Sequence, residues 1–472
     1  MKRWLLAVIV CSLVASGCSR YKKVTELEDS DSTQKETEES AVKVSVQPGK
    51  KPVKVKGIYI SGYMAGSEGM EKILDKIKGT EINTVVIDVK NDDGRITFAM
   101  DGAPMVQEIG AEERCIKDMN ALMKELKSRG LYTIARVVAF RDPYLAEKKP
   151  EWSLKNKDGS LHRDNKGLAW VNPYRQEVWD YLVEVGIEAS EIGFDEIQFD
   201  YIRFATDSSM NEVVFDEKDT KGRSKTDVIT EFIQYAYGKL SPRDIFVSAD
   251  VFGTIIGSKV DAERVGQVYE DMAEHLDYIC PMIYPSHYSD GNFDIEHPDM
   301  EPYKTILAAL DRSKQELLEN KKEGKEQAVV RPWLQDFTAS YLDHYIPYGP
   351  KEVRDQIQAV YDAGYDEWIL WSASNRYTWE GLLTMEEGKK EQEEIERLRP
   401  STQTAPQEMK ETKESSKSSE AYLSLEGQVQ EEQIQEEQIQ EEETTPVNPV
   451  KKDKKTKKKP NVVIVTTGGS RN

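Results

Sequence analysis

The sequence has few of the residues that cross-link small exported domains or bind metals. Its 472 residues include four cysteines and five histidines. Two cysteines, Cys115 and Cys280, lie outside the N-terminal segment, too few for a disulfide framework. We expect both to be free thiols, with a single disulfide between them as the alternative. The histidines are scattered and show no zinc-ligand spacing, so we expect no metal site, and nothing in the sequence calls for a cofactor.

An excess of positive charge is also missing. The chain has 85 acidic and 64 basic residues, and its formal net charge is -21. Proteins that bind nucleic acids present a basic face, so this class of partner is excluded from our expectations. The charge says little about the fold.

The N-terminus contains an apolar run that is too short to span a membrane comfortably. Lys2 and Arg3 precede WLLAVIVCSLVAS, as in a secretory signal. The small residues before Cys18 resemble a lipobox, which implies a lipid on Cys18 and anchoring at the extracellular face of the cell membrane. We therefore expect a signal peptide at 1–18 and a disordered polar tether at 19–52. An ordinary signal peptide with an incidental cysteine is the alternative.

The C-terminal segment, residues 401–472, loses apolar content. It contains the repeat QEEQIQEEQIQEE at 430–442 and the lysine block KKDKKTKKK at 451–459. Such composition predicts a disordered, charged tail. Contact of the lysine block with a cell wall or with lipid headgroups is the alternative to a merely solvated tail.

Between 53 and 400, short apolar runs alternate with amphipathic segments. Runs rich in β-branched and aromatic residues predict buried parallel strands at 54–62, 83–90, 132–140, 196–204, 245–253, 277–285, 328–337 and 367–374. Apolar residues at three- and four-residue spacing predict helices at 70–79, 116–130, 173–193, 226–240, 262–276, 302–320, 351–364 and 385–398. We expect Asn172 to cap the third helix and Pro173 to lie in its first turn. Gly130 and Gly193 are expected to end the second and third helices.

Eight strands and eight helices in alternation predict a single (β/α)₈ TIM barrel, an α/β fold. A doubly wound open sheet is the alternative. It is disfavoured because the first strand is followed by SGYMAG, which is not a glycine-rich phosphate loop.

Active sites of such barrels lie at the carboxyl ends of the strands, and these ends are polar here. The two-residue period of a strand places Asp200 with Gln198, and Asp250 with Ser248, on the face that points into the barrel. Two inward carboxylates on adjacent strands are the groups that hydrolyse glycosidic bonds. We predict Asp200 and Asp250 as the catalytic pair. A single aspartate at a strand end, taken alone, has a structural role about as often as a catalytic one. Asp92 and Asp93, before Gly94, are interpreted as turn residues.

Other strand-end residues are predicted to bind substrate or tune the carboxylates. Arginines can keep a neighbouring carboxylate ionised, and aromatic faces stack on sugar rings. Asp336 has the opposite strand parity from Trp333 and Gln335, so it needs a bulge to point inward. The predicted set is Asp88, Arg136, Arg203, Tyr284, Trp333, Gln335, Asp336 and Trp371.

Several motifs carry a family resemblance that covers about residues 53–400. They are GFDEIQFDYIRF (193–204), KGIYISG (56–62), VVIDVKNDDGRI (85–96), SADVFG (248–253), CPMIYPSHY (280–288), RPWLQDF (331–337) and WILWSASNRY (368–377). The chain resembles the glycosyl hydrolase domain family of bacterial lipoproteins and exported proteins, which implies a (β/α)₈ hydrolase barrel.

A more distant similarity is to the alpha-amylase superfamily. It implies a nucleophile at Asp200, an acid/base at Asp250 and a further carboxylate at Asp336. The residue on the fifth strand departs from that pattern because it is Asp rather than Glu.

The expected function is hydrolysis of O-glycosidic bonds in a cell-surface or environmental polysaccharide, by a monomer without a cofactor. One alternative is a carbohydrate-binding surface lipoprotein without catalysis. Another, a metal-dependent polysaccharide deacetylase, needs a histidine-rich site, and the scattered histidines count against it.

Overall fold

The computed structural model describes residues 51–323 and 325–398. The predicted signal peptide, the lipidation site Cys18, the tether up to residue 50 and the charged tail lie outside these residues and stay predictions. Within the described part of the chain, no helix is both long enough and apolar enough to cross a membrane. Cys115 and Cys280 are both free thiols, as predicted.

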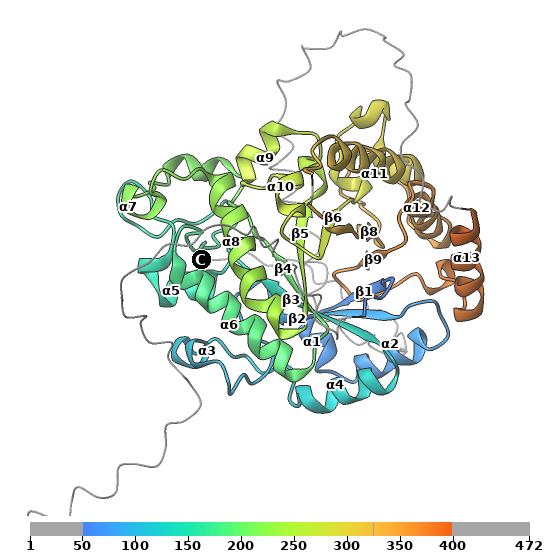
Figure 1. Ribbon diagram of the computed structural model, residues 1–472, viewed down its shortest axis with the longest axis horizontal. Helices are drawn as coiled ribbons and strands as arrows, with labels where there is room; N and C mark the ends of the chain where they lie inside the picture. Colours follow the sequence, from blue (N-terminus) through green and yellow to red (C-terminus); the bar gives the residue numbers. More distant parts are fainter. Residues whose placement is uncertain (1–50, 324, 399–472) are drawn as a thin grey trace, which may run out of the picture. The chain divides into compact units, whose positions relative to one another are not determined.

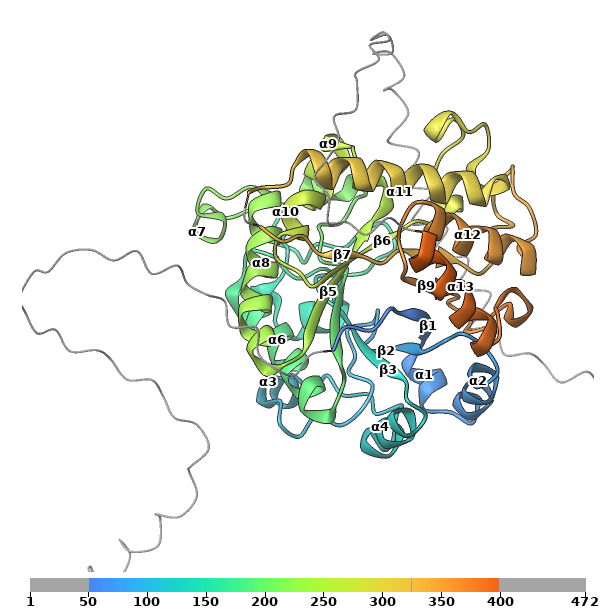
Figure 2. The ribbon, with the colours of Figure 1, turned by 45° about the vertical axis from the view of Figure 1, so that its right-hand side comes forward.

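The strands form one closed parallel barrel (Figures 1 and 2). The first strand pairs with the second and the last, and the fifth pairs with the fourth and the sixth, so the sheet has no free edge. This confirms the predicted (β/α)₈ fold. The strands are β1 (Lys56–Ile60), β2 (Thr84–Lys90), β3 (Tyr132–Val138), β4 (Glu196–Asp200), β5 (Phe246–Phe252), β6 (Tyr278–Met282), β7 (Val329–Val330), β8 (Trp333–Gln335) and β9 (Trp368–Trp371).

The seventh barrel position is shared by two short strands. β7 and β8 both pair with β6, and Arg331 and Pro332 separate them. The continuous strand predicted at 328–337 is therefore wrong in detail. Proline has no N–H to donate to a neighbouring strand, which interrupts the ladder at this point. The Pro332 carbonyl still accepts from the Ile369 N–H over 3.0 Å, so the barrel stays closed.

Helices surround the barrel in the order that the sequence predicts (Figure 2). The longer ones are α2 (Gly69–Ile77), α4 (Met119–Ser128), α6 (Gln176–Ile192), α8 (Lys225–Leu240), α11 (Pro302–Glu319), α12 (Pro350–Asp362) and α13 (Met385–Leu398). Short helices lie in the connections: α1 (Gly62–Ala65), α3 (Pro104–Ile109), α5 (Pro143–Lys148), α7 (Glu217–Thr220), α9 (Lys259–Val265) and α10 (Tyr269–Ala273).

Two helix boundaries differ from the prediction. The segment expected as one helix at 262–276 breaks into α9 and α10 at Gly266, whose φ of 86° belongs to the left-handed region. The third long helix starts at Gln176, after Arg175, because Asn172 closes a turn with the N–H of Tyr174 instead of capping the helix. Gly193 does end this helix in a left-handed conformation, as predicted.

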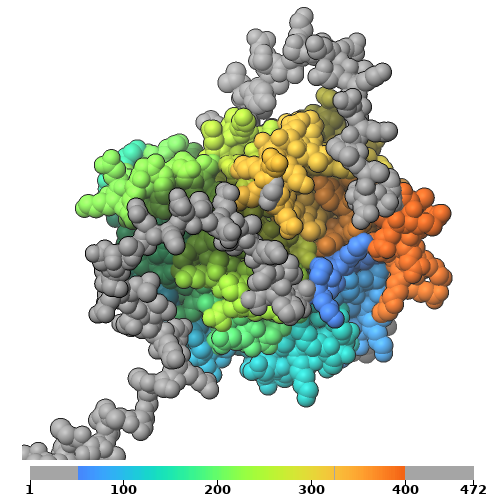
Figure 3. Space-filling view, in the orientation of Figure 1, coloured from blue at the N-terminus to red at the C-terminus, as the bar shows by residue number. Residues whose placement is uncertain are grey.

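The last helix, α13, contacts the segment that precedes the first strand. Lys54, just before β1, contacts Glu396 of α13 over 2.7 Å. The space-filling view shows the same neighbours, the blue start of the barrel beside the orange α13 (Figure 3). This contact ties the last helix to the first strand.

A buried ion-pair cluster fills the amino-terminal half of the barrel interior. The Arg331 guanidinium lies 2.8 Å from Glu196 and 2.8 Å from Glu367, and its side chain has no exposed surface. Its charge is compensated on both sides, and Tyr278 covers its face at 3.7 Å. The candidate site is formed by other polar side chains, at the carboxyl ends of the strands.

Candidate active site

A cavity opens at the carboxyl ends of the barrel strands. The empty space around it, which includes open solvent, is about 570 Å³. The residues that line it are Asp92, Arg136, Asp200, Tyr201, Asp250, Met282, Tyr284, His287, Trp333, Phe337, Trp371 and Ala373. The position agrees with the general rule for this fold.

Alternation along β4 directs its polar residues inward. Phe199 packs its ring against Phe232 of α8, at 5.4 Å between centroids. Its neighbours on the other face point into the barrel: the Gln198 amide contacts Cys280 Sγ at 3.3 Å, and Asp200 lines the cavity. Asp200 and Asp250, on the adjacent strands β4 and β5, therefore reach the same cavity, as the sequence predicts.

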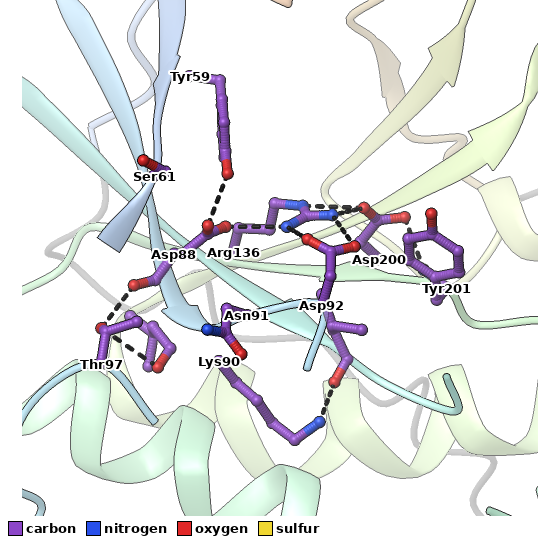
Figure 4. Close-up of polar contacts among 12 residues, drawn as sticks. Tyr59, Ser61, Asp88, Lys90, Asn91, Asp92, Thr97, Arg136, Asp200 and Tyr201 are labelled. Carbon is purple, nitrogen blue, oxygen red and sulfur yellow. Dashed lines mark hydrogen bonds and ion pairs between the residues drawn. The ribbon is translucent and has the colours of Figure 1, made fainter. Parts of the chain in front are cut away.

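Arg136 on β3 is the centre of the charged network (Figure 4). Its Nε donates to Asp200 Oδ2 over 2.8 Å, and its Nη1 donates to Asp88 Oδ1 over 2.8 Å. A third carboxylate, Asp92, accepts from Nη1 over 3.1 Å. One buried guanidinium thus binds carboxylates from β2, from the turn after β2 and from β4. It compensates the negative charge of Asp200, as predicted.

Asp92 is both a turn residue and part of the cavity wall. The turn that was predicted is present, because the Gly94 N–H donates to the Asn91 carbonyl over 3.0 Å. The Asp92 side chain also contacts Arg141, besides Arg136. Burial alone would raise the pKa of Asp92, but the two arginines outweigh it and the pKa is lowered. Asp92 is therefore a fixed negative charge at the cavity.

Asp88 lies behind Arg136 rather than at the cavity surface. It accepts a hydrogen bond of 2.6 Å from the Tyr59 hydroxyl and is almost fully buried. Burial raises its pKa to about 6, against the opposing charge of Arg136. Asp88 was predicted to contact substrate, but the structure places it as a support that orients Arg136.

Asp250 differs from Asp200 in its surroundings. Its Oδ1 accepts a hydrogen bond of 2.7 Å from the indole N–H of Trp333 on β8. Burial raises the pKa of Asp250 well above its usual value, and the negative charge of Asp200 raises it further. Two carboxylates in one cavity thus have unlike environments: one is paired with an arginine, and the other favours its proton.

Aromatic rings form much of the cavity wall. Trp371 lies 4.3 Å from the Tyr59 ring and 5.6 Å from the Trp333 ring, between centroids. Trp333, Trp371 and Tyr284 all line the cavity, as predicted. These rings give the cavity apolar faces beside the charged side chains that also line it.

Besides Asp88, three more residues predicted to bind substrate do not line the cavity. Gln335 is fully buried and holds the loops together, donating to Asp299 Oδ1 over 3.0 Å. Asp336 accepts a 2.6 Å hydrogen bond from the Thr378 hydroxyl, and burial raises its pKa to about 6. Its strand parity turns it away from the cavity, and no bulge re-aims it. Arg203 lies 4.4 Å from the centre of the Phe252 ring.

Sequence reasoning did not single out several cavity residues. Met282, at the end of β6, carries no charge or aromatic ring that would draw attention to it. The others follow strands as loop residues: Tyr201, His287, Phe337 and Ala373. Strand parity gave no signal for these residues, because it applies only within a strand and does not set where a loop side chain points.

The histidines are not all scattered in space. His297 and His344 stack with 3.7 Å between ring centroids, and both contact Asp290. The three residues are a set that could hold a metal ion. Spacing along the sequence did not reveal this set, because the loops bring together residues that are far apart in the sequence.

Several solved structures resemble the chain. A hypothetical protein from Ruminiclostridium thermocellum ATCC 27405 is 39% identical over 41% of this chain and 97% of its own, with a TM-score of 0.38. The glycoside hydrolase domain of PgaB (BpsB) from Bordetella bronchiseptica is 12% identical, covering 68% of this chain and 94% of its own, with a TM-score of 0.48. The α-galactosidase TtGalA from Thermus thermophilus is 14% identical, covering 73% and 62%, with a TM-score of 0.42.

The curated proteins contain no match to the chain. A family model described as "Putative glycosyl hydrolase domain" matches residues 57–377, from the second residue of β1 to beyond the end of β9. The match covers more than half of the chain and all eight positions of the barrel. The chain belongs to this family of glycosyl hydrolase domains.

Proposed function

We propose that the protein hydrolyses O-glycosidic bonds of a polysaccharide with Asp200 and Asp250. The observation that carries the proposal is the unlike environment of two carboxylates in one cavity. Asp200 is paired with Arg136 over 2.8 Å, whereas burial and Asp200 raise the pKa of Asp250. Glycoside hydrolysis needs one ionised carboxylate and one that can donate a proton.

In this proposal Asp250 is the general acid. Its proton passes to the oxygen of the departing sugar as the bond between that oxygen and the anomeric carbon breaks. Asp200 attacks the anomeric carbon, and water then displaces it, leaving its hydroxyl on the sugar and returning a proton to Asp250. Atoms and charge balance over the two steps, and no cofactor takes part.

Arg136 and the cavity aromatics hold the substrate and the carboxylates in place. The guanidinium fixes Asp200 through both Nε and Nη2, which orients its oxygens. Trp333, Trp371 and Tyr284 supply ring faces on which the apolar faces of sugar rings can stack. A charged floor between aromatic walls suits a carbohydrate better than an apolar ligand.

The proposed setting is the outer face of the cell membrane. The N-terminal Lys2-Arg3, apolar run and Cys18 support a lipid-anchored exported protein that acts as a monomer. A surface or environmental polysaccharide is then the accessible substrate. Globomycin-sensitive processing and a mass increase at the N-terminal peptide would test this; an unmodified Cys18 in the mature chain would refute it.

A specific contact favours a second candidate function, carbohydrate binding without hydrolysis. Both oxygens of Asp200 are engaged, Oδ2 by Arg136 and Oδ1 by the Tyr201 N–H over 2.6 Å. A carboxylate held in this way is a less available nucleophile. The two functions differ in one respect only, whether the bound glycan is cut.

The test is hydrolysis of a panel of α- and β-linked glycans by the full chain. Asp200→Asn and Asp250→Asn are each expected to lower kcat at least about 100-fold with folding intact. Asp311→Asn, an exposed aspartate of α11, is the matched control and should keep wild-type activity. Activity that survives both cavity substitutions would refute the assignment. Glycan binding without any product would establish the second candidate.

A further inference from the structure

Three side chains with metal-binding atoms meet outside the cavity, in the loops at the carboxyl end of the barrel. Asp290 and His297 come from the connection between β6 and α11, and His344 comes from the connection between β8 and α12. Their ligand atoms all lie within 4.8 Å of one another. The proposed hydrolysis uses none of them.

The distances fit a small tetrahedral ion. Oδ2 of Asp290 lies 3.0 Å from Nδ1 of His297 and 3.0 Å from Nδ1 of His344. Zinc binds nitrogen and oxygen at about 2.0–2.2 Å, so neighbouring ligands of a tetrahedral site are roughly 3.3 Å apart. The distances from Asp290 to the two histidines are therefore close to those between ligands of such a site.

The orientation of His297 points to a ligand other than Asp290. Its Nδ1 is buried and, among the described residues, has no acceptor aligned for a hydrogen bond, although Asp290 Oδ2 is at hydrogen-bond distance. Its other nitrogen, Nε2, lies 3.9 Å from Glu296 Oε1. This distance is too long for a hydrogen bond, so Glu296 does not orient the ring.

The stacked rings support the same conclusion. His297 and His344 lie 3.7 Å apart between centroids, with 28° between the ring planes. The stacking brings one ring nitrogen of each histidine within 4.8 Å of the other, as ligands of one ion require.

We propose that Asp290, His297 and His344 bind one divalent transition-metal ion of the zinc type. Imidazole and carboxylate ligands suit zinc, and three protein ligands leave a fourth position for water. The side chains are partly exposed, at 56%, 25% and 50% respectively, so the ion can enter from solvent.

The ion would join two loops that supply the cavity wall. His287 lines the cavity three residues before Asp290, and Phe337 lines it seven residues before His344. The loops already touch where the Tyr348 hydroxyl donates to the Asp299 carbonyl over 3.2 Å. A bound metal would add a further link between the two loops and fix both of them.

The test is titration of the metal-free full chain with Zn²⁺ at pH 7 by calorimetry, with Tm measured in parallel. One equivalent is expected to bind, and Tm is expected to rise. Because loss of an outer partner alone lowers metal affinity about 10–100-fold, loss of a ligand should raise Kd at least about 10-fold. His297→Gln, His344→Gln and Asp290→Asn should each do so and abolish the rise in Tm.

His275→Gln is the matched control, because His275 bonds to Gln234 and lies outside this set. It should bind Zn²⁺ like the wild-type chain, and any weak binding by the acidic tail is common to all variants. If a substitution unfolds the chain, the wild-type chain is titrated with Co²⁺ in place of Zn²⁺. The visible absorption of tetrahedral Co²⁺ then reports binding at the site. Equal Zn²⁺ affinity in the three variants and the control, or no tetrahedral Co²⁺ spectrum, would overturn the proposal.

Discussion

Trp333 donates its indole N–H to Asp250 Oδ1 over 2.7 Å, from β8 across β6 to β5. This hydrogen bond stabilises the ionised form of Asp250 and so lowers its pKa, against the burial and the Asp200 charge that raise it. A residue of the cavity wall therefore lowers the proton affinity of the proposed general acid, although burial and Asp200 keep its pKa raised.

Trp333→Phe is expected to move the alkaline limb of the pH–rate profile to higher pH. Without the indole donor the pKa of Asp250 rises, and the acid keeps its proton further into the alkaline range. A hydrogen bond to a charged group contributes about 1.5–3 kcal/mol, which corresponds to a shift of about one to two pH units. The measurement is kcat as a function of pH on the substrate found in the glycan panel.

The control for this prediction is Trp371→Phe. It trims another ring of the same cavity and leaves the hydrogen bond to Asp250 in place. An equal shift in both variants would mean that cavity shape, and not the indole donor, sets the alkaline limb.

Arg136→Met is expected to destabilise the fold by about 3–5 kcal/mol, because it leaves buried carboxylates without a counter-charge. Arg136 is 2% exposed and pairs with Asp88, Asp92 and Asp200. Arg129 is the matched control: it also contacts three carboxylates, Glu71, Asp75 and Glu125, but these lie at the surface. Arg129→Met should cost less than about 1 kcal/mol. Urea unfolding at pH 7 measures both, and equal losses would contradict the central role of Arg136.

Asp336→Asn is expected to flatten the dependence of stability on pH between about 4 and 6. Burial raises the pKa of Asp336 to about 6 in the folded chain, from 3.8. The folded state therefore holds the proton more tightly, and the wild-type chain loses stability as pH rises through this window. The loss from this one group is about 3 kcal/mol at most.

The measurement is the free energy of unfolding at several pH values. Asp311→Asn, at an exposed position, should leave the wild-type slope unchanged. A slope that is the same in Asp336→Asn and in the wild type would show that Asp336 does not titrate in this window.

Gly94→Ala is expected to destabilise the turn that carries Asp92 into the cavity. Gly94 has a φ of 77°, and a Cβ there would lie 1.9 Å from Asp142 Oδ1. Asp142 forms a buried ion pair with Lys90 at 2.8 Å, so it cannot move without weakening that pair. Gly159 has a similar φ of 82° but no atom within 4 Å of its Cβ position.

Gly159→Ala should therefore show the cost of the left-handed backbone alone, about 1–2 kcal/mol. Gly94→Ala should add about 1–3 kcal/mol for the steric conflict. Thermal unfolding of the two variants gives the comparison, and equal Tm values would contradict the close packing of Asp142 on this turn.

The sequence predicted the barrel because its determinants are local. Alternating buried and amphipathic segments fix each strand and helix by its own periodicity, and eight repeats leave few ways to bury them all. Details that depend on a neighbouring strand were not predictable in the same way. At the break in the seventh strand, Ile369 of the neighbouring strand donates to the Pro332 carbonyl and keeps the barrel closed.

Part of the candidate site was also accessible from the sequence. Parity within one strand is enough to direct Asp200 and Asp250 into the barrel. Parity could not show that Gln335 serves loop packing, or that Asp88 stands behind Arg136. Those distinctions depend on the position of each strand end along the barrel axis. The stagger between neighbouring strands sets that position.

The sequence by itself determined the fold class, the inward direction of the two carboxylates and the acidity of the chain, since each follows from residue type and spacing. Only the tertiary structure decided which charges meet. Arg136 gathers carboxylates from three places in the chain, and the loops bring His297 and His344 to Asp290. Such encounters depend on loop paths, and a loop path is set by packing over the whole molecule, which periodicity does not encode.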